Sequence, residues 1–142
     1  MVTSTTDTGL PTQEEHTAAM EKFLKGDFEA TRHFLERRRD WFLQAGSEPF
    51  SRDKFIAGRK SHGEPVDEVM VSGARRLVED LRRGFLHDAA EAASMLGALA
   101  AMMLEYDEAI KHYEQAAMLN PSNTQYLQKA QEYKARAAEK IR

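Results

Sequence analysis

The sequence contains no cysteine among its 142 residues. This absence excludes disulfide bridges, thiolate catalysis and cysteine-ligated zinc or iron–sulfur centres, and it fits a reducing compartment. Long apolar runs are also missing, because the most apolar uncharged stretch, 92–104, is shorter than the ~20 residues that a membrane span needs. Residues 1–11 lack the basic and apolar regions of a signal peptide. We therefore expect a cytoplasmic protein with no membrane insertion and a disordered tail over 1–11.

Neither sign of charge dominates the chain, whose formal net charge is −3. This near balance gives no general reason to expect binding to nucleic acid or to an anionic membrane. With 42% hydrophobic and 30% charged residues, the chain has enough apolar side chains for a core. Its length is that of one ordinary domain.

Motifs for catalysis and metal binding are absent from the sequence. It has no glycine-rich phosphate loop, no nucleophile elbow and no HExxH zinc motif. His87 with Asp88 or Glu91 is the one local pair that resembles a ligand or acid–base pair, and helical spacing alone often produces such pairs. We therefore expect no enzyme activity, no metal site and no cofactor.

Apolar residues recur with helical spacing along the chain, and no segment alternates convincingly with a period of two. The pattern predicts an all-α protein, with Gly84 ending one helix and Leu77 and Leu81 buried. Poor periodicity predicts a loop or irregular segment over 46–64, with at most a turn or two of helix near 53–57. The expected helices span about 13–25, 28–44, 65–83, 88–104, 107–119 and 124–140.

A pattern of small residues, one aromatic ring and a late proline indicates two short antiparallel helices that pack very closely. This pattern resembles the tetratricopeptide repeat (TPR), a helix–turn–helix unit of ~34 residues. The resemblance extends over 90–121, although the repeat's early tryptophan and its first-helix tyrosine are replaced by Ala93 and Ala100. The residues that carry it are Leu96, Gly97, Ala109, Tyr113, Ala116 and Pro121.

The resemblance implies stacked antiparallel helix pairs that form a short right-handed superhelix with a peptide-binding groove. One repeat cannot bury its own apolar faces, and about three are normally needed, so the flanking helices must complete the stack. The expected single domain, 12–142, comprises a degenerate repeat (12–45), the irregular segment (46–64), a partial repeat (65–85), the clear repeat (88–121) and a capping helix (123–141).

The first helix of a TPR lines the family's groove, which implies a partner-facing role for Glu91, Ser94, Ala98 and Ala101. These positions are small and nearly uncharged. They either leave room for an apolar side chain or a partner helix, or are covered by the protein's own N-terminal helices. Four nearby methionines are expected to fill the core rather than form a docking surface: Met95, Met102, Met103 and Met118.

Four arginines recur seven residues apart on one predicted helix: Arg75, Arg76, Arg82 and Arg83. Because acidic residues are interspersed among them, the first interpretation is a solvated, salt-bridged surface. The second is a cradle for an acidic or phosphorylated peptide or for nucleic acid, although nucleic acid is the less expected ligand.

The sequence thus favours a non-catalytic adaptor, scaffold or chaperone-like module that binds a peptide or helix of a partner protein. One alternative is a structural unit for homo-oligomerisation, whose groove is filled by its own subunits. A weaker alternative is an arginine-driven binder of acidic peptide or nucleic acid.

Overall fold

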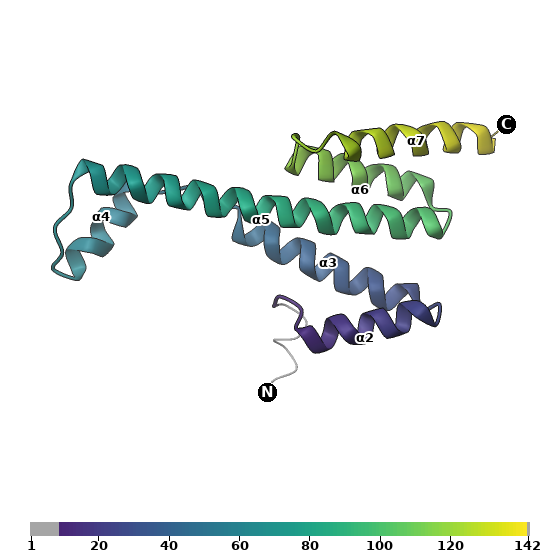
Figure 1. The fold of residues 1–142 in the computed structure, drawn as a ribbon, viewed down its shortest axis with the longest axis horizontal. Helices are drawn as coiled ribbons and strands as arrows, with labels where there is room; N and C mark the ends of the chain where they lie inside the picture. Colours follow the sequence, from purple (N-terminus) through teal and green to yellow (C-terminus); the bar gives the residue numbers. More distant parts are fainter. Residues whose placement is uncertain (1–8, 142) are drawn as a thin grey trace.

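The computed structural model describes residues 9–141, and it confirms the all-α prediction for them. The tail expected over 1–11 lies mostly outside this range. In its described part, the Gly9 carbonyl accepts a 3.1 Å hydrogen bond from the guanidinium of Arg37. The helices (Figure 1) are α2 (Gln13–Leu24), α3 (Phe28–Ala45), α4 (Arg52–Ser61), α5 (Glu68–Met102), α6 (Tyr106–Leu119) and α7 (Thr124–Ile141).

The first two helices begin and end where the sequence predicts. Thr12 and Glu15 form a capping box, which satisfies the free N–H groups at the start of α2. Gly26 has a φ of 89°, a left-handed conformation that glycine adopts without steric cost. The Asp27 side chain then accepts from the Ala30 N–H and starts α3. As a result, α2 and α3 form an antiparallel pair.

The predicted helix end at Gly84 is wrong, because α5 runs through it without a break for 35 residues. A glycine inside a helix costs only about 1 kcal/mol relative to alanine. Aromatic packing by the next residue offsets that cost, because the Phe85 ring stacks on Phe42 and meets Trp41 edge-on. The expected partial repeat over 65–85 is therefore the first half of the same helix that opens the predicted clear repeat.

The segment 46–64, predicted to be a loop or irregular, contains the ten-residue helix α4. The Ser51 hydroxyl caps its first turn, and Gly63 follows it with a φ of 71°. An ion pair joins Arg52 to Glu68 of α5. The sequence gives a weak signal here because α4 has no buried residue and hence no sharp apolar stripe.

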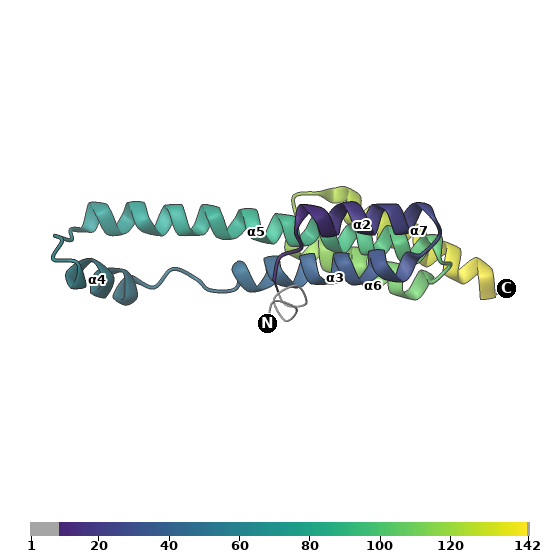
Figure 2. The same ribbon diagram turned by 90° about the horizontal axis from the view of Figure 1, so that it is seen from below.

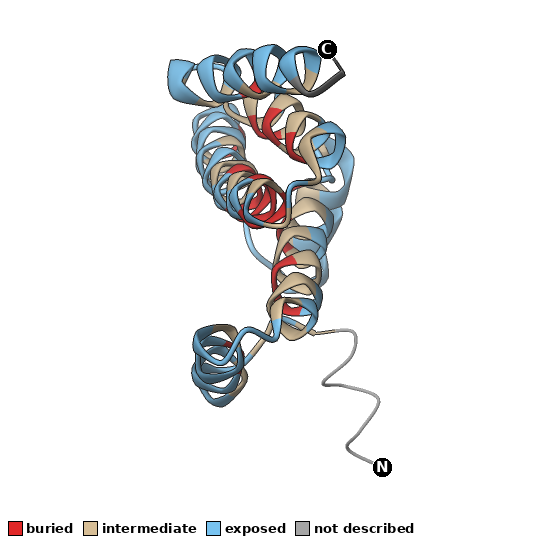
Figure 3. Ribbon diagram, turned by 90° about the vertical axis from the view of Figure 1, so that its right-hand side faces the viewer, coloured by how far each residue is buried: buried red, intermediate tan, exposed pale blue. Residues whose placement is uncertain are grey.

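The core lies in the second half of α5 and its neighbours, with buried residues along the facing sides of α3, α5 and α6 (Figure 3). One cluster joins Phe34 and Leu35 of α3 to Leu96 and Leu99 of α5. A second joins alanines of α5 to Ala116 of α6. Antiparallel pairing continues from α5 to α6 and from α6 to α7 (Figure 1).

Residues 68–84 of α5 project from this body together with α4 (Figures 1 and 2), and we call these two segments the arm. Within 68–84, Val71 is the one buried residue. Leu77 and Leu81 were predicted to be buried, but they are 60% and 56% exposed. The prediction fails because no described helix covers their side of α5.

Candidate partner-binding groove

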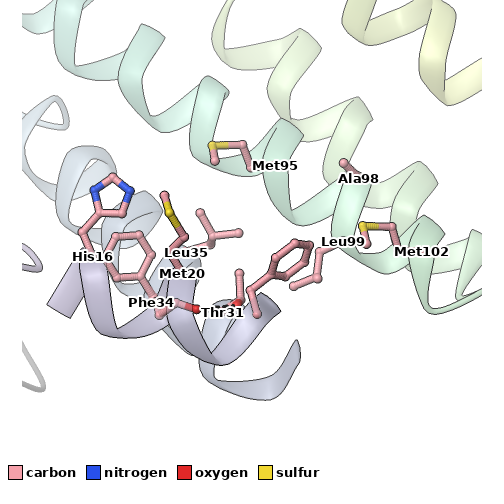
Figure 4. A pocket seen from close by; sticks show the side chains of 11 residues that line it. His16, Met20, Thr31, Phe34, Leu35, Met95, Ala98, Leu99 and Met102 are labelled. Carbon is pink, nitrogen blue, oxygen red and sulfur yellow. Dashed lines mark hydrogen bonds between the residues drawn. The ribbon is translucent and has the colours of Figure 1, made fainter. Parts of the chain in front are cut away.

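An apolar groove of about 280 Å³ lies between α2 and the second half of α5 (Figure 4). Each wall is a helical stripe with spacing i, i+3, i+4, i+7, so each presents one face to the groove. Phe34 and Leu35 of α3, both buried, form its floor together with Thr31. The walls are His16, Ala19, Met20 and Phe23 on α2, and Met95, Ala98, Leu99 and Met102 on α5.

Methionines give the groove its open apolar rim. Met20, Met95 and Met102 are 55%, 47% and 54% exposed. The prediction that Met95, Met102 and Met118 fill the core is therefore wrong, while Met103 does pack against the core. The apolar residues of 88–104 lie on nearly every side of the helix, a pattern typical of a helix with neighbours all round. In the structure α3 and α6 pack against α5 but leave one of its sides open to the groove.

The groove's polar atoms are few and largely engaged. The Thr31 hydroxyl donates to the Ala19 carbonyl at 3.4 Å, and the His16 ring lies 5.3 Å from that of Phe34. None of the described residues that line the groove is aspartate, glutamate, lysine or arginine. The site therefore suits an apolar ligand segment that is selected by shape and by desolvation.

The sequence-based groove positions match this site at Ala98, which lines it. Ser94 and Ala101 are half-buried and Glu91 is exposed, but these three lie outside the lining. The Ser94 hydroxyl instead donates to the Glu91 carbonyl at 2.7 Å. On α5, sequence reasoning missed Met95, Leu99 and Met102, whose signal was their spacing of three, one and four residues from Ala98. It also did not place the α2 wall or the α3 floor at the site, because no local pattern shows that these helices lie against this part of α5.

The residues of the repeat-like pattern hold α5 against α6. A Cβ atom on Gly97 would lie 2.7 Å from the Tyr113 ring, so glycine permits this close helix crossing. The pattern's leucine and alanines are buried too, and Pro121 is exposed after the end of α6. Their contacts fix the rotation of α5 about its axis, and this rotation turns Met95, Ala98 and Met102 toward the groove. The buried residues are Leu96, Gly97, Ala109, Tyr113 and Ala116.

The four arginines of α5 lie in the arm, away from the groove. The Arg75 guanidinium stacks over the Phe50 ring at 5.3 Å, and the Arg82 Nε donates to the Gly46 carbonyl at 2.8 Å. Arg83 pairs with Asp80 at 3.0 Å, and Arg76 is exposed. These contacts favour the structural interpretation of the arginines over a cradle for an anionic ligand.

Within residues 9–141, no three histidine, aspartate or glutamate side chains gather as potential metal ligands. No helix in the described part of the chain combines the length and apolar character needed to cross a membrane. Comparison of the chain with protein-family models, curated proteins and solved structures found no match.

Proposed function

We propose that the protein is a non-catalytic, TPR-like interaction module that holds an apolar helical segment of a protein in the groove between α2 and α5. The supporting observation is the exposure of Met20, Met95 and Met102 around a concave, uncharged surface. Methionine is polarizable and flexible, so a methionine rim adapts to different apolar side chains. A cytoplasmic location, which the cysteine-free sequence favours, is part of this proposal.

A helix suits this groove better than an extended strand does. Its walls are two helices, each presenting one apolar stripe, and a third amphipathic helix can place its i, i+3, i+4 and i+7 side chains between them. By contrast, strand addition needs an exposed sheet edge, and residues 9–141 contain no strand.

Site-specific photo-crosslinking in living cells tests the proposal. A photoreactive residue in place of Met102 should crosslink to a polypeptide through an apolar segment of helical periodicity. The Met95→Glu change should abolish the product, because a carboxylate in the apolar contact must be desolvated or protonated. Met118, on α6 outside the groove and 81% exposed, is the matched control position. Equal crosslinking at Met102 and Met118, or a product unaffected by Met95→Glu, would reject the groove as the binding site.

A further inference from the structure

Met102 and Met103 are adjacent in sequence, but their side chains lie in opposite environments. Met102 is 54% exposed on the rim of the groove. Met103 packs against the core, and its Sδ accepts a hydrogen bond from the Arg32 guanidinium at 3.1 Å. Met20 and Met95 share the exposure of Met102 and line the same groove (Figure 4). We call Met20, Met95 and Met102 the rim methionines, and they are open to reagents in solution.

An exposed thioether is a site of covalent chemistry. The chain has no cysteine, so its methionine sulfurs are the atoms that a peroxide oxidises most readily. The sulfur lone pair attacks the terminal oxygen of a hydroperoxide, a sulfur–oxygen bond forms, and the oxygen–oxygen bond breaks. Water or an alcohol leaves, so the sulfur is oxidised and the peroxide is reduced by one electron pair. A sulfur that is shielded and already accepts a hydrogen bond, as in Met103, reacts more slowly.

We propose that the rim methionines are a reversible oxidation site that controls access of the partner to the groove. Oxidation converts each flexible, apolar side chain into a polar and chiral sulfoxide. The reduced rim binds an apolar helix, and the oxidised rim releases it. This inference rests on the proposed function of the groove and adds its regulation.

The described side chains of the lining offer few hydrogen-bond donors to a sulfoxide oxygen. The Thr31 hydroxyl already donates to a backbone carbonyl. The His16 ring lies one helical turn from Met20 on α2, away from the α5 wall, where Met95 and Met102 are accompanied by alanine and leucine only. A docking apolar helix would therefore remove water from these oxygens without replacing its hydrogen bonds. Each unpaired sulfoxide should weaken binding by roughly 10-fold.

Oxidation of the rim should leave the fold intact. The rim methionines are exposed, so an added oxygen there remains in solvent when the groove is empty. Met103, whose oxidation would place a polar oxygen against Leu99 and the rest of its core cluster, has the protected sulfur. The predicted signature is a change in the groove without a loss of helix, which differs from general oxidative damage.

The first test follows the order of oxidation in the purified full-length chain. Hydrogen peroxide is added, and peptide mass mapping measures the gain of oxygen at each methionine. The rim methionines should react together with Met118, which is exposed outside the groove, and well before Met103, while the helical circular dichroism stays constant. Oxidation of Met103 as fast as the rim, or loss of helix in step with rim oxidation, would overturn the inference.

The second test measures the effect on binding in the photo-crosslinking chain described above. With the photoreactive residue at Met102, Met20 and Met95 remain, and peroxide treatment of the cells should lower the crosslinked product by roughly 10-fold or more. Adding Met20→Leu and Met95→Leu keeps an apolar rim of similar volume, so this chain should keep its product. Adding Met118→Leu instead should leave the product sensitive to peroxide. An equal loss with and without the two rim leucines would show that peroxide acts elsewhere.

The third test is reversal. Methionine sulfoxide reductases of the A and B types each act on one sulfoxide epimer. With a dithiol reductant, which becomes a disulfide while the oxygen leaves as water, the two together should return all three rim methionines to their original mass. One type alone should leave the other epimer. Rim sulfoxides that resist both reductases would contradict a reversible site.

The outcomes separate this inference from the proposed function. If untreated cells give no specific crosslink at Met102, the groove is not the binding site and the proposed function fails. If the crosslink forms and persists although mapping shows that Met20 and Met95 are oxidised, the groove binds its partner and the inference alone fails.

Discussion

At the scale of single residues, two glycines of α5 have opposite roles. Gly97 lies under the Tyr113 ring, and a Cβ atom there would sit 2.7 and 2.8 Å from two ring carbons. Gly73 has no other group within 4 Å of the position where its Cβ would stand. The first glycine is required by packing, and the second only lowers the helix propensity of the arm.

We therefore expect Gly97→Ala to lower the free energy of unfolding by about 1–3 kcal/mol through overpacking. Gly73→Ala on the same helix should raise it by about 0.5–1 kcal/mol, because alanine loses less conformational freedom on folding. Urea denaturation followed by circular dichroism measures both. Changes of the same sign in the two variants would contradict this assignment.

At the scale of secondary-structure elements, the sequence predicted the ends of α2, α3, α6 and α7 to within about one or two residues. These ends depend on local chemistry, such as the Thr12 capping box and the left-handed Gly26, which a short window contains. The continuity of α5 depends instead on Trp41, Phe42 and Phe85, which meet across distant parts of the chain. A local pattern cannot show whether such packing outweighs the cost of a glycine.

The candidate groove was only partly predictable, because part of it follows from a local pattern and part depends on packing between distant segments. Ala98 follows from the repeat-like pattern, but the exposure of Met95 depends on where α2 lies. The sequence left two arrangements open, a free surface and one covered by the N-terminal helices. In the structure α2 lines one side of the groove and leaves its rim open, so the arrangement combines features of both.

The two halves of α5 should differ in local stability. Residues 89–100 contribute most of the buried positions of this helix, whereas Val71 is the one buried position within 68–84. Local opening is easiest where few apolar contacts are lost. We expect backbone amides of 69–84 to exchange hydrogen much faster than those of 89–100, as measured by mass spectrometry. Equal protection of both halves would show that α5 opens as one unit, against this expectation.

At the scale of the whole molecule, His112 makes the fold sensitive to pH. Its ring is half-buried on α6, and burial lowers its pKa from the ordinary 6.5, with a smaller contribution from Arg39. Glu108 and Glu36 act in the opposite direction, but the net shift is downward. The unfolded chain therefore binds a proton at this residue more readily than the folded chain does.

This difference fixes the sign of the pH dependence. As the pH falls below about 6.5, the unfolded state is protonated first, so stability should decrease until the pH reaches the lower pKa of the folded state. His112→Gln should remove this part of the slope. The urea midpoint of both chains between about pH 5 and 7.5 measures it, and parallel profiles would show that His112 does not contribute.

The continuity of α5 also has a consequence for synthesis on the ribosome. Phe34 and Leu35 leave the ribosome early, but Leu96 and Leu99, which cover them, follow about 60 residues later, which corresponds to roughly 3–12 s at ordinary translation rates. During that interval the α2–α3 pair exposes its apolar side to the cell. The nascent chain is therefore a natural client for chaperones until the last turns of α5 emerge.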